Sequence, residues 1–104
     1  MATAFNIVYS PDVLAHVAAI ERKYHRLIER AIVEQLRHSP TQATRNRKPI
    51  QDLPGPFGST WELRFGPDNR LRAFYEISGH EVWVLAIGVK DRNRLLIAGE
   101  EMTG

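Results

Sequence analysis

Arginines gather on one predicted face of a sheet in the C-terminal half of this chain. Residues Trp61–Phe65 and Arg70–Ile77 both alternate apolar with polar side chains, and the turn-forming residues 66–69 separate them. Because successive side chains of a strand point to opposite faces, Arg64 and Arg72 share the polar face of this predicted hairpin. Two cations on a rigid surface favour a polyanion, and RNA phosphate is the simplest candidate.

Two further basic stretches accompany this hairpin. A third apolar segment, Val82–Gly88, extends the predicted sheet to a three-stranded antiparallel meander and leads into Lys90, which we expect beside the arginines. The other cations that we expect to bind RNA are Arg45, Arg47, Lys48, Arg92 and Arg94. The acidic residues concentrate elsewhere in the chain. This asymmetry, more than the net charge of +2, indicates an anionic partner.

Glu62 lies two residues before Arg64 on the same predicted face, where an ion pair with the arginines is the simplest role for its carboxylate. Lys48 could reach in from the preceding loop. The four histidines lack the spacing of a zinc site, and His16 reads as a polar position on a helix. No glycine-rich phosphate loop or serine elbow is present, so we expect neither a metal nor a cofactor.

The N-terminal half contains the elements that must support this sheet. Phe5–Tyr9 has the pattern of a strand, and Ser10–Asp12 has the composition of a helix start. Apolar residues then recur with a helical period up to Leu36, and Pro40 closes the region. One long helix or two helices that break near Arg22–His25 fit this pattern. The small size of the chain favours two, because a single rod would be about 40 Å long.

The remaining segments have weaker patterns. Thr41–Gly58 is rich in proline and glycine, and we expect an irregular, mobile loop that carries basic residues toward a ligand. Leu95–Ala98 is either a helical turn or an edge strand. The end of the chain, Gly99–Gly104, is expected to fray.

Composition sets the outer limits of the interpretation. The length of 104 residues predicts one domain over residues 1–104, and the 43% of hydrophobic residues is typical of a folded globular chain. The absence of cysteine fits a reducing cytoplasm, where we expect the protein to act. No apolar run reaches the length of about 18 residues that a membrane span requires, and the N-terminus lacks the pattern of a signal peptide.

The order of these elements resembles the RelE/ParE superfamily, the toxins of bacterial type II toxin–antitoxin systems. The resemblance covers nearly the whole chain as an α+β fold, with an N-terminal strand, two helices or one long bent helix, and a three-stranded antiparallel meander. The local matches are Ser39-Pro40, Leu63-Arg64, the strand Asn69–Ile77 and the segment Val82–Arg92. None of these matches is a strict motif, and their joint order carries the resemblance.

The resemblance implies a toxin that a cognate antitoxin protein neutralises. RelE-like members cut mRNA on the ribosome and so inhibit translation, which makes ribosome-dependent endoribonuclease activity the leading expectation. ParE-like members instead inhibit DNA gyrase by binding, and a third alternative is an inactive relative that only binds its antitoxin. In the RelE-like alternative, Arg72 falls at the position that contacts the scissile phosphate. Lys90 falls at a second cationic position, and Arg64 matches a basic position on the neighbouring strand.

This chain differs from RelE at the positions where RelE carries its candidate proton-transfer residues. Thr60 and Glu62 stand where RelE presents two lysines, and Leu96 stands near the place of its C-terminal tyrosine. The phosphate-binding cations are therefore expected to be intact, with Arg72, Arg64, Lys90 and Glu62 as the predicted catalytic set. Cleavage at an RNA 2′-hydroxyl also needs a group that accepts its proton, and Glu62 is the best-placed base among them.

Overall fold

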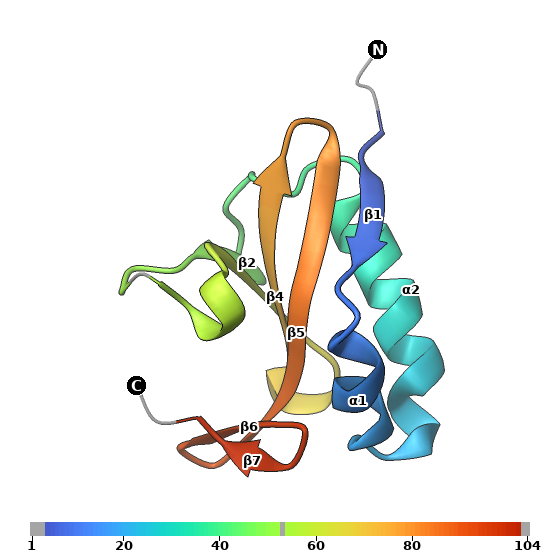
Figure 1. Cartoon of the computed structure of the whole chain (residues 1–104), viewed down its shortest axis with the longest axis vertical. Coiled ribbons are helices and arrows are strands. Elements are labelled where there is room, and N and C mark those ends of the chain that lie inside the picture. The colour runs from blue at the N-terminus through green and yellow to red at the C-terminus, as the bar shows by residue number, and fades with distance from the viewer. Residues whose placement is uncertain (1–3, 53, 103–104) are drawn as a thin grey trace.

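The chain folds as a mixed β-sheet with its two helices packed against one face (Figure 1). The computed structural model of the protein describes residues 4–52 and 54–102. The N-terminal elements are β1 (Asn6–Tyr9), α1 (Val13–Ala18), the 3-10 turn η1 (Arg22–Tyr24) and α2 (His25–Leu36). They are followed by β2 (Arg47–Pro49), η2 (Pro56–Gly58), β3 (Trp61–Phe65), η3 (Pro67–Asn69), β4 (Leu71–Ser78), β5 (Glu81–Asp91), β6 (Arg94–Ile97) and β7 (Glu100–Glu101).

The helical region consists of two helices, which confirms the alternative that the sequence favoured. At its start, the Asp12 N–H donates to the Ser10 Oγ at 3.4 Å. Between α1 and η1, Glu21 adopts an extended conformation with φ −50° and ψ 132°. This break lets Ile20 and Ile28 both turn into the same buried cluster.

The sheet follows the order β2-β3-β4-β5-β6-β7, with β1 paired to β5 outside this path. β5 is the long central strand. One of its edges pairs with β4, and its other edge is shared by β1 over Glu81–Val84 and by β6 over Gly88–Asp91. The pair of β1 with β5 is parallel, and the other pairs are antiparallel. The expected meander of β3, β4 and β5 is therefore present within a larger sheet.

The two faces of the sheet have different roles. The core face packs against α1 and α2 and carries Leu63, Phe65, Leu71, Ala73, Tyr75, Val82, Val84 and Ile87. The outer face carries Lys48, Glu62, Arg64, Arg72, Phe74, Ala86, Gly88, Lys90, Leu95 and Ile97, as the strand register and side-chain alternation require. A β-bulge at Leu85 shifts the alternation of β5, so that Val84 and Ile87 both reach the core face.

Two expectations about irregular segments were wrong, and for a third the structure selects one of the two alternatives. Thr41–Gly58 is not irregular throughout, because β2 pairs with β3 inside it and η2 follows. Leu95–Ala98 contributes a strand, since β6 extends the edge of β5. The expected fraying after Gly99 is contradicted at β7, which pairs with β6, while Thr103 and Gly104 lie outside the described residues. Each of these short strands forms because a longer neighbour supplies its hydrogen-bond partners.

The architecture is α+β, with a small helical layer and a largely antiparallel sheet, as the sequence predicted. No helix among the residues that the structure describes is both long and apolar enough to cross a membrane.

Candidate nucleic-acid interface

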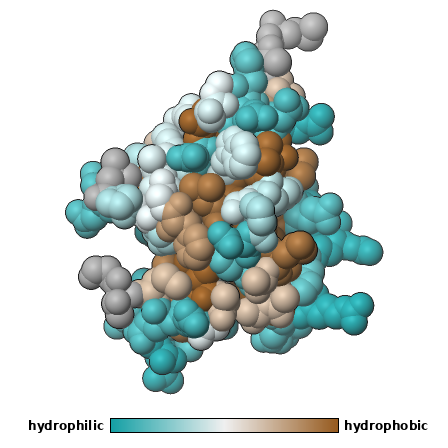
Figure 2. Space-filling view, viewed as in Figure 1, coloured by the Kyte–Doolittle hydropathy of each residue, from teal (hydrophilic) through white to brown (hydrophobic). Residues whose placement is uncertain are grey.

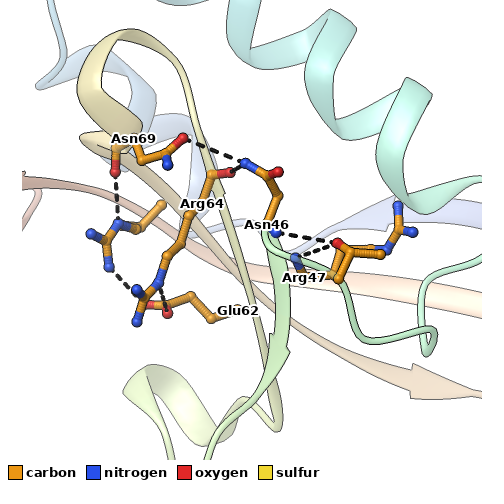
Figure 3. Close-up of polar contacts among 7 residues, drawn as sticks. Asn46, Arg47, Glu62, Arg64 and Asn69 are labelled. Carbon is orange, nitrogen blue, oxygen red and sulfur yellow. Dashed lines mark hydrogen bonds and ion pairs between the residues drawn. The ribbon is translucent and has the colours of Figure 1, made fainter.

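Arg64 and Arg72 lie directly opposite each other on β3 and β4, and Glu62 joins them. The Arg64 Nε donates to the Glu62 Oε1 at 2.7 Å, and the Arg72 Nη1 donates to the Glu62 Oε2 at 3.3 Å (Figure 3). Like charges directly opposite on a sheet repel each other, so the carboxylate offsets a cost that the two arginines would otherwise impose. We call Glu62, Arg64 and Arg72 the arginine cluster.

The arginine cluster retains donors for a ligand. The side chain of Arg72 is 13% exposed and that of Arg64 is 37% exposed. The Arg72 Nε donates to the Asn69 main-chain oxygen at 3.0 Å. Within the described residues, the Nη1 and Nη2 of Arg64 and the Nη2 of Arg72 donate no hydrogen bond. A phosphate at this end of the outer face would therefore meet fixed guanidinium groups with unused N–H donors.

Two predicted lysines extend the cationic surface on either side. Lys48 of β2 lies opposite Glu62, and its side chain shares the outer face. Lys90 of β5 lies two residues from Gly88, which is opposite Arg72, so Lys90 is on the outer face as well. Neither lysine forms an ion pair with another described residue. The outer face thus presents cations from four adjacent strands.

The structure places Arg47, which the sequence grouped with the RNA-binding cations, away from the arginine cluster. It lies opposite Leu63, so its side chain is on the core face, and α2 captures it. The Arg47 Nη1 donates to the Gln35 main-chain oxygen at 2.9 Å and to the Gln35 Oε1 at 2.8 Å, and its Nε donates to the Gln42 main-chain oxygen at 3.0 Å. The basic segment is therefore a fixed strand at Arg47 and Lys48 and not a mobile loop.

The other predicted RNA-binding residues lie at the periphery. Arg45 is exposed in the connection before β2. Arg92 and Arg94 are exposed at the turn between β5 and β6, where Arg92 has a φ of 58° and Arg94 pairs with Asp91 at 3.4 Å. The structure does not bring these three residues into the arginine cluster. Their positive charges can attract an anionic partner from a distance, but they do not meet at a single phosphate position.

Proton transfer remains the weak part of the site. Both carboxylate oxygens of Glu62 accept from guanidinium groups, so the ion pair with the arginines that the sequence predicts for Glu62 is present. Leu96 is opposite Val89 and on the core face. Glu76 is on the outer face but lies four residues along β4 from Arg72, beyond Phe74. That separation is about 13 Å along the strand.

A small apolar cluster covers the middle of the outer face. Phe74, Ala86 and Ile97 are each at most 2% exposed, and Ile50, Leu95 and Met102 pack against them. Apolar side chains also gather over the centre of the face seen in Figure 2, with hydrophilic residues around them. Through Ile50 and Met102, this apolar cluster holds the segment before η2 and the segment after β7 against the sheet. Along β4 its Phe74 separates Arg72 from Glu76.

His16 is buried, which the sequence-based assignment to a polar helix position did not predict. Its Nδ1 accepts from the Ile87 N–H at 3.2 Å, at the stretch of β5 between its pairings with β1 and β6. The ring also meets the edge of Phe57 at a centroid distance of 4.9 Å. Burial lowers the pKa of His16, and the charge of Asp12 opposes this shift. The imidazole therefore completes a strand edge and takes no part in the arginine cluster.

Asn46 and Asn69 were not predicted from the sequence to belong to the site. Both contact the arginine cluster, and their signal in the sequence is no more than that of ordinary turn residues.

The residues described by the structure contain no group of three or more histidine, aspartate or glutamate side chains that could hold a metal ion. Comparisons with models of known protein families, with curated proteins and with solved structures found no match.

Proposed function

We propose that this chain is a toxin of the RelE/ParE superfamily that inhibits translation by cutting mRNA on the ribosome. The arginine cluster on the outer face, flanked by Lys48 and Lys90, is the single observation that carries the proposal. The order of strand, two helices and antiparallel strands supports it, because the resemblance in sequence runs through the same elements.

In this proposal the arginine cluster binds the phosphate at the scissile bond. Arg72 is fixed at two points, by Asn69 and by Glu62, and it offers its remaining N–H group to the phosphorane. Preorganised donors stabilise developing negative charge without the cost of moving into place. Arg64 and Lys90 add charge from the neighbouring strands. Glu62 orients both arginines, and the lone pairs that its two ion pairs leave unused make it the candidate base for the 2′-hydroxyl proton.

Cell-free translation with purified protein, followed by primer extension along a defined mRNA, tests this function. The reaction is run with ribosomes, without ribosomes and with Arg72→Ala. Cuts that require both ribosomes and Arg72 are the expected result. Intact mRNA and normal protein synthesis at saturating toxin would contradict the proposal.

A second candidate function is a toxin of the same superfamily that binds its target and catalyses no reaction. Because both oxygens of Glu62 are engaged in ion pairs, the same surface suits an inhibitor that acts by binding, as a ParE-like inhibitor of DNA gyrase would. A gyrase supercoiling assay separates the two candidates, since inhibited supercoiling with intact mRNA favours the second. Either toxin would act in the cytoplasm with a cognate antitoxin as its partner. An inactive relative that only binds the antitoxin would leave both assays unaffected.

A further inference from the structure

Asn46, the residue before β2, holds both main-chain groups of Arg64. Its Nδ2 donates to the Arg64 main-chain oxygen at 2.8 Å, and its own main-chain oxygen accepts from the Arg64 N–H at 2.8 Å. Figure 3 shows the Asn46 side chain between β3 and the turn that follows it. Asn46 therefore fixes the strand at the position from which the Arg64 side chain leaves.

The same amide reaches the turn that holds Arg72. The Asn46 Nδ2 lies 3.4 Å from the Asn69 Oδ1, and the Asn69 main-chain oxygen accepts from the Arg72 Nε at 3.0 Å. Asp68 and Asn69 have φ values of 54° and 53°, in the left-handed region that residues other than glycine seldom adopt. A turn in this conformation persists when its surroundings hold it, and Asn46 supplies one such contact.

Only an amide satisfies these contacts. A main-chain oxygen can only accept, so the group that Asn46 presents to Arg64 must be its NH₂. An aspartate of the same shape would place a carboxylate against the Arg64 and Asn69 oxygens, which would repel it. Asn46 is itself fixed by Thr44, whose Oγ1 accepts from the Asn46 N–H at 3.2 Å and from the Arg47 N–H at 3.0 Å.

We propose that Asn46 is a positioning residue for the arginine cluster, acting on Arg64 through its main chain and on Arg72 through Asn69. Its role in catalysis rests on the proposed function, whereas its role in fixing the two guanidinium groups does not. In this arrangement the side chain that organises the cations comes from the residue that precedes the edge strand β2.

The Nε–H resonances of arginine, observed by NMR in the free protein, report the proposed role directly. In the wild-type protein the Arg64 and Arg72 Nε–H groups are expected to exchange with solvent more slowly than that of Arg22, an exposed residue whose side chain has no hydrogen bond to a described residue. Asn46→Ala and Asn46→Asp are each expected to accelerate the Arg72 exchange by about tenfold, the loss that the neutral hydrogen bonds of the Asn46 amide to Arg64 and Asn69 together imply. Asn6→Ala, at an exposed asparagine of β1, is the matched control and should leave both signals unchanged.

Unchanged Arg64 and Arg72 signals in either folded Asn46 variant would overturn the inference. So would wild-type Nε–H groups that exchange as fast as that of Arg22, a result that needs no variant. Ribosome-dependent cleavage is measured on the same samples, with an expected loss of about tenfold in Asn46→Ala and none in Asn6→Ala. If the wild-type protein cuts no mRNA, the proposed function fails while the resonances still decide the role of Asn46.

Discussion

Arg47 and Arg72 lie on opposite faces of one sheet and show how differently two arginines of a basic surface can act. Arg47, on the core face, directs its guanidinium to Gln35 and Gln42 and ties β2 to the helical layer. Arg72, on the outer face, is held by Asn69 and Glu62 and keeps N–H donors for a ligand. The face of the sheet, and not the local density of charge, separates a structural arginine from a candidate functional one.

Arg72→Ala is expected to have the largest effect on function. Removal of a fixed donor at a developing phosphorane costs about 100-fold in activity by analogy with oxyanion-hole donors, so the variant should no longer arrest growth when expressed. Its circular dichroism should match the wild-type spectrum, because Arg72 is not part of the buried apolar clusters. Arg26→Ala on α2 is the control. Growth arrest by Arg72→Ala at wild-type potency would place the functional surface elsewhere.

Arg47→Ala is expected to show the opposite pattern. It leaves the Gln35 and Gln42 oxygens without their charged donor, which should lower the free energy of unfolding by about 2 kcal/mol in urea titrations. Activity per folded molecule should stay at the wild-type level. A stable variant with lost activity would return Arg47 to the RNA-binding set and break the distinction between the two faces.

Glu62→Gln tests whether the carboxylate offsets the repulsion between Arg64 and Arg72. The variant should be destabilised at low ionic strength by up to about 1 kcal/mol, since the two arginines are direct cross-strand partners. The difference from the wild-type protein should narrow in high salt, which screens the partly exposed pair. A loss of stability that does not depend on salt would indicate packing and not charge.

His16 gives the smallest predicted effect and a pH dependence with a defined sign. Its Nδ1 must be unprotonated to accept from the Ile87 N–H, and burial lowers its pKa below the ordinary value of 6.5. The stabilisation is therefore complete above about pH 6.5 and is lost as the pH falls through the lowered pKa. Denaturation midpoints of His16→Gln should change less between pH 7 and pH 5 than those of the wild-type protein. His38→Gln, at an exposed position, should retain the wild-type dependence.

The outcome for the two faces shows what a sequence can predict. Alternation over β3 and the first part of β4 correctly placed Leu63 and Tyr75 inside and Arg64 and Arg72 outside, because a strand has a strict local period of two. The bulge at Leu85 could not be predicted this way, since it depends on how β5 satisfies different partners along its edges. The two-residue alternation predicts which face of the sheet a side chain occupies only as far as the first β-bulge.

The incorrect assignments share a dependence on distant residues. Arg47 looked like a loop cation because its partner Gln35 lies on α2, which contacts β2 only in the folded chain. His16 looked like a polar helix position because the N–H that it accepts from belongs to Ile87, far along the sequence. Neither contact leaves a signal within one segment, so both arginine and histidine were judged by their usual exposure.

Primer extension on one mRNA with ribosomes and equal concentrations of folded wild-type protein, Arg47→Ala and Arg72→Ala tests the central claim most directly. The account predicts matching cuts with the wild-type protein and Arg47→Ala and none with Arg72→Ala. Cuts by Arg72→Ala as strong as those of the wild-type protein would contradict the assignment of the outer face as the site that acts on RNA.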